Sequence, residues 1–529
     1  MTQSTPAPAA PIALATSDAT QAGIGERSIQ WCLLSHTNTG KTTLTRTLLG
    51  GDVGEVADGA HVTVESQRHL LQSTPGGDEL WLWDTPGFGD SLRLYQRLAQ
   101  QGNPLGWFLS NVWDRWRDKP FFLSQRALRA GRDHADVMLY LVNAAEDPAD
   151  AGYWRSEMGI LQWLDKPVIV LLNQVGAETS PTQTAADLAR WREAVTPWRG
   201  IVREVLVLDA FTRSWWHERR MMQSIAPLLP PAKQPAYARL LAERERAQAE
   251  REAESLQALA EQLLASAALR QEPGPGQDKL LGRVWSRLRD GVAQSARLGR
   301  SEGTEDSEAR AAPPAVKAAM EHLLEQTRQA DERATNQLLQ IHALDGKAAS
   351  QIQRQLQGQL SVSTPIDAQS AGLWGALATG AATGLGADLA AGGLTLGAGA
   401  LIGALVGGLG FAGAALGVNH MFDQEKQRVE LSPAYLDELA ALALLKYLVI
   451  SHFGRGRGRY TGQPAPSQWA DAVRSAIEPD AAQWLKLWQQ VRSSSEQERP
   501  SAAALQAEAE QLLQQALARA MERLYPGLE

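Results

Sequence analysis

An eight-residue stretch, S-H-T-N-T-G-K-T at residues 35–42, restricts the fold of this chain more than any other feature. A short apolar, strand-like run leads into this stretch, and helix-prone residues follow the stretch. Gly40 lets the backbone approach an anion closely, and the amide groups that open a helix point at the same place. Lys41 adds a positive charge, and the Thr42 hydroxyl is placed to ligate Mg²⁺. The stretch therefore predicts a phosphate-binding loop between a strand and a helix, with Ser35 in place of the usual first glycine.

A second motif, D-T-P-G, follows another strand-like run and begins at Asp84. Its carboxylate is placed to hold Mg²⁺ through water. The backbone N–H of Gly87 is placed to contact a γ-phosphate and to release the following loop when that phosphate leaves. The two motifs in this order and setting indicate a nucleoside triphosphate site. Thr63 is either a switch threonine on Mg²⁺ or an ordinary loop residue. We expect catalytic roles for Lys41, Thr63, Asp84 and Gly87, and metal ligation by Thr42, Thr63 and Asp84.

Short apolar runs alternate with helix-compatible segments as far as about residue 215. This alternation is typical of an α/β sheet that is covered on both faces. The segment of about residues 91–133 is longer than the single helix that this position needs. We interpret it as an insert, which is either a lid or partner surface beside the second motif or a helical insert without such a role.

With these motifs in place, the sequence resembles the Era/TrmE-type bacterial GTPases, a class related to the translation factors. The phosphate loop matches the family pattern N-x-G-K-[ST] at Asn38, Gly40, Lys41 and Thr42. The D-T-P-G motif also matches, and hydrophobic Phe88 follows it where Ras-like enzymes have glutamine. The resemblance covers residues 27–215. It implies a six-stranded, mostly parallel sheet with helices on both faces, GTP and GDP as ligands, Mg²⁺ as cofactor and GTP hydrolysis. It also implies K⁺ as a further cofactor, held with the help of Asn38.

The guanine-binding motif departs from the family pattern. N-K-x-D becomes N-Q-V-G, so that Asn173 keeps its position while Gly176 has no carboxylate for the base. A hydrogen bond to a charged group contributes about 1.5–3 kcal/mol, so two missing bonds lower base selectivity by several powers of ten. Asp209 is either a substitute acceptor or an ordinary cap residue, and the N–H of Ala210 is placed to meet the base carbonyl. The expected nucleotide contacts are Ser35, Asn38, Thr39, Gly40, Lys41, Thr42, Thr43, Asn173, Gln174, Asp209 and Ala210.

Behind this head the composition changes to that of helices. The first residues have neither the basic start nor the apolar core of a secretion signal, and we expect a disordered tail. The predicted division is a tail at 1–26, a GTPase-like domain at 27–215, a helical or coiled-coil-like segment at 216–300, a flexible linker at 301–314, a helical segment at 315–370, a Gly/Ala-rich apolar hairpin at 371–418 and a helical C-terminal domain at 419–529.

The Gly/Ala-rich hairpin contains one charged residue, Asp388. Its glycines recur at four-residue spacing, as at Gly399, Gly403 and Gly407, and this spacing allows helix backbones to pack closely. The length fits two membrane passes of about 20 residues each. We favour a membrane segment, which places the protein on the cytoplasmic face of the inner membrane. The alternative is a tightly packed soluble hairpin, which places it in the cytoplasm.

The leading hypothesis is a GTP-hydrolysing switch that couples its nucleotide state to a helical, membrane-associated region. Two other classes remain open. One is a non-hydrolysing nucleotide-binding scaffold, and the other is a membrane-remodelling or pore-forming protein regulated by the head. Expected partners are GTP and GDP, membrane lipid, and a second copy or another protein through the helices. The net charge of −8 argues against a protein that coats nucleic acid, although it allows a local basic patch.

Overall fold

The computed structural model describes about three fifths of the chain. The described residues are 25–37, 39–50, 66–100, 104, 106, 109, 119–175, 181–210, 214–271, 314–344, 429–431, 433–452, 467–493 and 500–526. The hairpin predicted at 371–418 lies outside them, as does nearly all of the predicted tail and linker. The chain divides into two compact units, and the change from the first to the second within the long helix α9 falls between Ala247 and Gln248.

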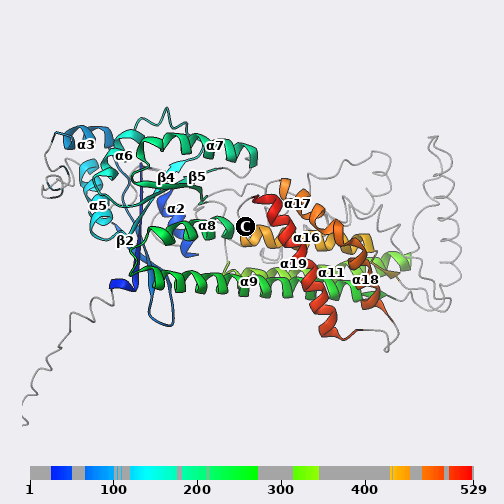
Figure 1. Ribbon diagram of the computed structural model, residues 1–529. Helices are drawn as coiled ribbons and strands as arrows, with labels where there is room; N and C mark the ends of the chain where they lie inside the picture. The colour runs from blue at the N-terminus through cyan, green and yellow to red at the C-terminus, as the bar shows by residue number, and fades with distance from the viewer. Residues whose placement is uncertain are drawn as a thin grey trace, which may run out of the picture. The chain divides into compact units, whose positions relative to one another are not determined.

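The first unit is built on a six-stranded sheet in the order β2-β3-β1-β4-β5-β6 (Figure 1). The strands are β1 (Ser28–Ser35), β2 (Gln67–Ser73), β3 (Glu79–Asp84), β4 (Val137–Asn143), β5 (Val168–Asn173) and β6 (Val202–Val207). The β2–β3 pair is antiparallel, and the other neighbouring pairs are parallel. Strands β4 and β5 are buried almost throughout, as expected for parallel strands covered on both faces. The predicted six-stranded, mostly parallel sheet is confirmed.

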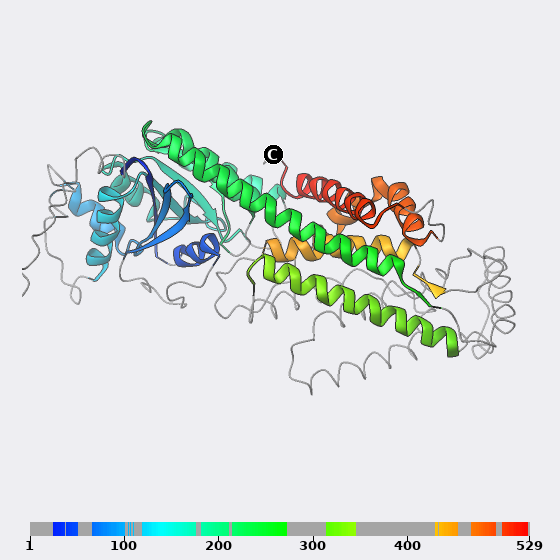
Figure 2. The same cartoon turned by 90° about the horizontal axis from the view of Figure 1, so that it is seen from below.

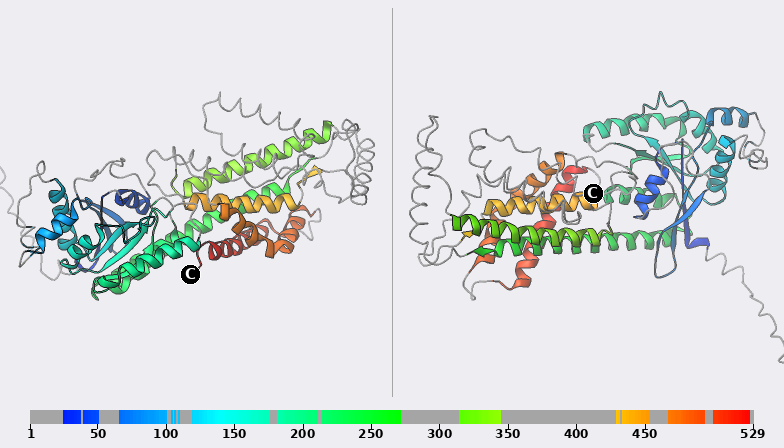
Figure 3. Two further views of the ribbon diagram at one scale, coloured as in Figure 1. Left: turned by 90° about the horizontal axis from the view of Figure 1, so that it is seen from above. Right: turned by 180° about the vertical axis from the view of Figure 1, so that it is seen from behind.

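Helices cover both faces of this sheet (Figures 1 and 3). Successive β1 residues face opposite cores: Leu34 packs in the cluster that contains Leu94, and Leu33 packs in the cluster that contains Leu44. The first cluster takes side chains from α3 (Ser91–Leu98), α5 (Lys119–Asp133), α6 (Trp154–Gln162) and α7 (Pro181–Ala194). The second takes them from α2 (Lys41–Leu49), α8 (Trp215–Ile225) and α9 (Gln234–Ala268). Two short 3₁₀ helices, Thr196–Trp198 and Ala226–Leu228, complete the unit.

The first unit extends beyond residue 215, where the sequence pattern had placed its end. Helix α8 and the start of α9 supply core residues such as Met222 and Tyr237. Helix α9 itself is the long green helix of Figure 2. The buried Asp78 carboxylate accepts two hydrogen bonds from Arg239 of α9, each 2.8 Å long, and a third from Arg27. These arginines hold the pKa of Asp78 well below its usual range. A change of composition toward helix therefore does not mark the end of the domain.

The second unit is helical, as predicted for the region behind the head. Its helices are the rest of α9, α11 (Pro314–Ile341), α16 (Pro433–Ser451), α17 (Ser467–Ile477), α18 (Ala481–Arg492) and α19 (Ala502–Leu524), with a 3₁₀ helix at Glu478–Asp480. Two short strands, β7 (Arg270–Gln271) and β8 (Val429–Glu430), pair antiparallel. Leucine and alanine side chains pack with Trp484 and Trp488 in one core. None of the helices in the described ranges combines the length and the apolar character needed to cross a membrane.

Candidate nucleotide site

The loop between β1 and α2 lies where the sequence motif places it. Strand β1 ends at Ser35, and α2 begins at Lys41. Gly40 caps the helix with φ 91° and ψ 26°, a left-handed conformation that favours glycine. A Cβ atom at this position would lie 2.6 Å from Asn173 Nδ2. Both the backbone conformation and the lack of space therefore require a glycine here.

Lys41 is buried at the start of α2, with 7% of its surface exposed. Its Nζ donates hydrogen bonds to Ser35 Oγ at 2.6 Å and to the His36 carbonyl at 3.3 Å. Burial lowers the pKa of Lys41 to about 8, while the carboxylates of Asp84 and Glu157 oppose this shift. The ammonium group therefore keeps its charge near neutral pH. The motif did not reveal that the Ser35 hydroxyl, in place of the first glycine, would accept this hydrogen bond.

Asp84 and Thr42 form the second part of the site. The Thr42 hydroxyl donates to Asp84 Oδ2 at 2.8 Å. Asp84 is 2% exposed, and its Oδ1 has no hydrogen-bond partner among the described residues. Burial raises the pKa of this carboxyl group, and the Thr42 bond and the Lys41 charge counteract the rise.

These two side chains fit a hard divalent cation. A buried carboxylate oxygen without a partner is costly unless a cation or water meets it. Magnesium prefers oxygen ligands from carboxylates and hydroxyls, usually together with retained waters. Thr42 and Asp84 supply this set of donors. Thr63, the third expected ligand, lies outside the described residues.

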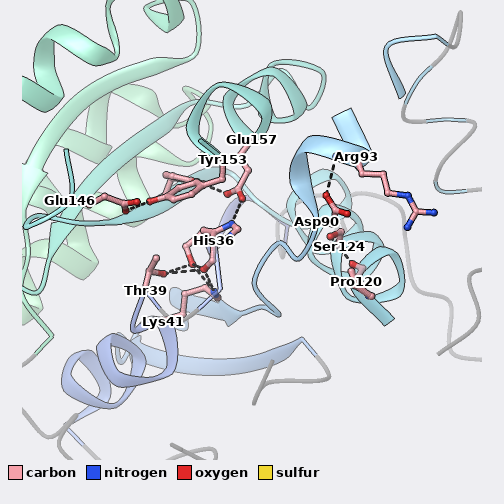
Figure 4. Close-up of polar contacts among 12 residues, drawn as sticks. His36, Thr39, Lys41, Asp90, Arg93, Pro120, Ser124, Glu146, Tyr153 and Glu157 are labelled. Carbon is pink, nitrogen blue, oxygen red and sulfur yellow. Dashed lines mark hydrogen bonds and ion pairs between the residues drawn. The ribbon is translucent and has the colours of Figure 1, made fainter. Parts of the chain in front are cut away.

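Gly87 lies against the phosphate loop. A Cβ atom at this residue would be 3.0 Å from both Lys41 Nζ and Thr37 Cα, so a side chain would push these neighbours back by a few tenths of an ångström. The next residue, Phe88, donates its backbone N–H to Ser35 O at 2.9 Å, and its side chain is fully buried. Helix α3 begins directly after this segment, with Asp90 accepting from Arg93 N at 3.1 Å (Figure 4). The segment expected to respond to a γ-phosphate therefore touches Lys41 and leads into α3.

On the base side, Asn173 connects two loops. Its Nδ2 donates to Thr39 O, and its Oδ1 accepts from Ala210 N, both at 2.7 Å. Asn173 and Ala210 meet because the carboxyl ends of the adjacent strands β5 and β6 lie at one edge of the sheet. The Ala210 N–H expected to meet the base carbonyl thus already has an acceptor, so a base could use it only by sharing or displacing this bond. Gln174 follows in a left-handed conformation, with φ 59°.

The remaining predicted nucleotide contacts either show only their burial in the structure or lie outside the described residues. Thr43 is buried in the first turn of α2, and Asp209 is half-buried directly before Ala210. Asn38 and Gly176 lie outside the described residues, so their expected roles stay predictions.

A polar network beside the loop was not predicted (Figure 4). His36 Nδ1 lies 2.6 Å from Glu157 Oε1, and Tyr140 donates its hydroxyl to Glu157 Oε2 at 2.5 Å. The His36 ring stacks on Tyr153, with centroids 4.2 Å apart and planes 10° apart. Burial next to Glu157 raises the pKa of Tyr140 well above its ordinary value, so its hydroxyl remains a donor. No spacing rule connects His36 with Glu157, which lies 121 residues later.

Comparison with known proteins identifies two regions of the chain. The family model described as 50S ribosome-binding GTPase matches residues 31–174. The model described as "Domain of unknown function (DUF3482)" matches residues 201–519, which is more than half of the chain. A search of curated proteins finds no match. The P-loop GTPase head expected from the sequence motifs is confirmed, and so is the region of unknown function behind it.

Solved structures show distant similarity. A structure of Era with MgGDPNP and part of 16S ribosomal RNA has 19% identity and a TM-score of 0.30, over 38% of this chain and 57% of that one. A variant of Aquifex aeolicus Era with GDP and aluminium fluoride has 18% identity and a TM-score of 0.29, with the same two shares. The chain thus spans 57% of the length of these Era structures. An oligomerised bacterial dynamin pair has 9% identity and a TM-score of 0.25, over 96% of this chain and 70% of that one.

Proposed function

We propose that this chain, which belongs to the DUF3482 family, is a Mg²⁺-dependent GTPase whose nucleotide state acts on its helical C-terminal region. A P-loop GTPase domain is present at residues 31–174. The proposal is that this domain hydrolyses GTP. The observation that carries the proposal is the convergence of Lys41, Thr42 and Asp84, whose Oδ1 has no hydrogen-bond partner among the described residues.

Each side chain of this group has a distinct task. Lys41 places its charge on the β- and γ-phosphates, and the backbone amides at the start of α2 add further donors. The Gly87 N–H contacts the γ-phosphate. Thr42, Asp84 and Thr63 hold Mg²⁺, which when bound neutralises charge on the phosphates.

The position of the attacking water needs another explanation, because Phe88 is an apolar side chain and is fully buried. We assign this task to backbone groups of the loop. K⁺, which Asn38 would help to hold, would supply positive charge beside the phosphates. The base contributes less to recognition than in a GTPase with an intact N-K-x-D motif, because Gly176 has no carboxylate.

The test is multiple-turnover phosphate release from GTP by the full chain. Lys41→Ala should lower the rate by at least about 100-fold, because it removes preorganised charge at the phosphates. Lys486→Ala removes an exposed lysine on α18 and serves as the matched control, with an unchanged rate. GTP binding without phosphate release would instead support the non-hydrolysing scaffold, and equal release by wild type and Lys41→Ala would disprove the site.

For the helical region we propose association with the inner membrane, with the protein on its cytoplasmic face. The support is the composition of residues 371–418, which contain one charge and glycines at four-residue spacing. We propose in addition that the helical region contacts a second copy or a protein partner. The membrane proposal predicts that the full chain sediments with membranes and that a chain lacking 371–418 does not. A full chain that stays monodisperse in the supernatant without detergent would show that these residues form a buried hairpin of a cytoplasmic protein.

A further inference from the structure

We propose that His36 and Glu157 are positioning residues of the phosphate loop: a donor at the Nδ1 position of residue 36, bound to a buried carboxylate, holds the loop against the Gly87 segment. The inference rests on the proposed function, because it concerns the same nucleotide site. It assigns a role to two residues that neither motif contains.

The His36 ring is fixed from two directions outside its own loop. Glu157 of α6 is fully buried, and each of its carboxylate oxygens has one close partner, His36 or Tyr140 of β4. An ionised carboxylate only accepts hydrogen bonds, and we therefore assign the proton of the 2.6 Å contact to Nδ1. Tyr153 stacks on the ring, and its own hydroxyl donates to Glu146 at 2.6 Å (Figure 4). The ring therefore has one orientation, set by α6 and the segment before it.

The backbone of His36 organises the loop around Lys41. Its carbonyl oxygen accepts from Ser35 Oγ at 2.5 Å, from Thr39 Oγ1 at 3.2 Å and from Lys41 Nζ at 3.3 Å. Glu157 also acts on Lys41 through its charge, which favours the protonated ammonium. A change at the ring is thus transmitted to the groups that face the phosphates.

The same residue borders the segment that would respond to a γ-phosphate. His36 forms an isolated parallel β-bridge with Phe88. Gly87 lies close to Thr37, the residue after His36, so that an added Cβ atom would be only 3.0 Å from Thr37 Cα. The His36–Glu157 pair therefore supports the part of the loop that borders the Gly87 segment. Its loss should affect the triphosphate state more than GDP binding.

Three substitutions at residue 36 separate the donor from the ring. His36→Asn keeps an amide N–H close to the Nδ1 position. His36→Gln moves that donor about one bond outward, to the Nε2 position, and His36→Phe keeps a ring for stacking on Tyr153 without any donor. The readouts are kcat for GTP and the affinities of the full chain for GDP and for a non-hydrolysable GTP analogue.

We expect His36→Asn to stay within about threefold of wild type in all three readouts. In His36→Gln and His36→Phe, kcat and analogue affinity should fall about tenfold while GDP affinity changes less than about threefold. A tenfold loss corresponds to about 1.4 kcal/mol, near the net contribution of one hydrogen bond to a charged group. In a Glu157→Leu background, His36→Gln should cause no further loss, because the two residues act as one pair. GDP affinity and thermal unfolding report on folding throughout.

Equal behaviour of the Asn and Gln variants would overturn the inference. A proportional loss of GDP affinity and kcat would also overturn it, because that pattern indicates general damage to the loop. Additive effects of the His36 and Glu157 changes would show that they are not a pair. If wild type binds nucleotide but does not turn it over, hydrolysis fails as a function while the ratio of analogue to GDP affinity still decides the inference. If wild type binds neither nucleotide, both fail.

Discussion

The phosphate end and the base end of the nucleotide site differ in what their side chains are arranged to meet. At the phosphate end, Lys41 and Asp84 are buried charges, and one oxygen of Asp84 has no partner among the described residues. At the base end, the Ala210 N–H donates a 2.7 Å hydrogen bond to the Asn173 side chain. The N-Q-V-G motif ends at Gly176, which has no carboxylate. On this difference rests our proposal that the site handles a triphosphate with a relaxed choice of base.

The largest effect is expected from Asp84→Asn, which tests the phosphate end. It should lower Mg²⁺-dependent turnover at least about 100-fold, because the metal loses its charged ligand. Burial raises the pKa of Asp84, so the ionised form opposes folding and a neutral residue should leave stability unchanged or increased. Phosphate release titrated with Mg²⁺, together with thermal unfolding, measures both. Asp133→Asn, at the exposed end of α5, is the control. Unchanged Mg²⁺ dependence in Asp84→Asn would remove Asp84 from the metal site.

A smaller effect is expected at the base end. Gly176→Asp should raise the preference for GTP over ATP by at least about tenfold, because each hydrogen bond to the new carboxylate contributes about 1.5–3 kcal/mol. Competition of GTP and ATP against a fluorescent nucleotide gives the ratio. The matching control is Gly152→Asp, at an exposed glycine with nothing within 4 Å of an added Cβ. An unchanged ratio in Gly176→Asp would mean that another group already serves as the acceptor, or that this backbone does not face the base.

The smallest effect concerns the monovalent cation. Turnover should be about three- to tenfold faster in K⁺ than in Na⁺, because a correctly sized cation stabilises charge that develops on the phosphates. Asn38→Ala should remove the difference, whereas Asn143→Ala, at the end of β4, should keep it. Equal rates in K⁺ and in Na⁺ would rule out a role for K⁺ in turnover.

Local patterns predicted the parts of the site that are continuous in the sequence. Gly40, Lys41 and Thr42 are adjacent, and their order predicts the position between a strand and a helix that they have in the structure. The alternation of apolar runs likewise predicted the sheet. Contacts between distant segments have no such signature. The His36–Glu157 pair and the Asn173–Ala210 bond depend on which strands become neighbours. The packing of α8 and α9 on the sheet was missed for the same reason.

Steady-state phosphate release from GTP and from ATP, measured side by side on the wild-type chain, tests the central claim most directly. An effective phosphate end with a relaxed base end predicts turnover of GTP that is abolished in Lys41→Ala. It also predicts a kcat/KM ratio of GTP to ATP that is about two to four powers of ten below that of a GTPase with an intact N-K-x-D motif, because two hydrogen bonds of about 1.5–3 kcal/mol each are missing. ATP turnover equal to or faster than GTP turnover would contradict the assignment as a GTPase, and absence of GTP turnover would contradict the account of the phosphate end.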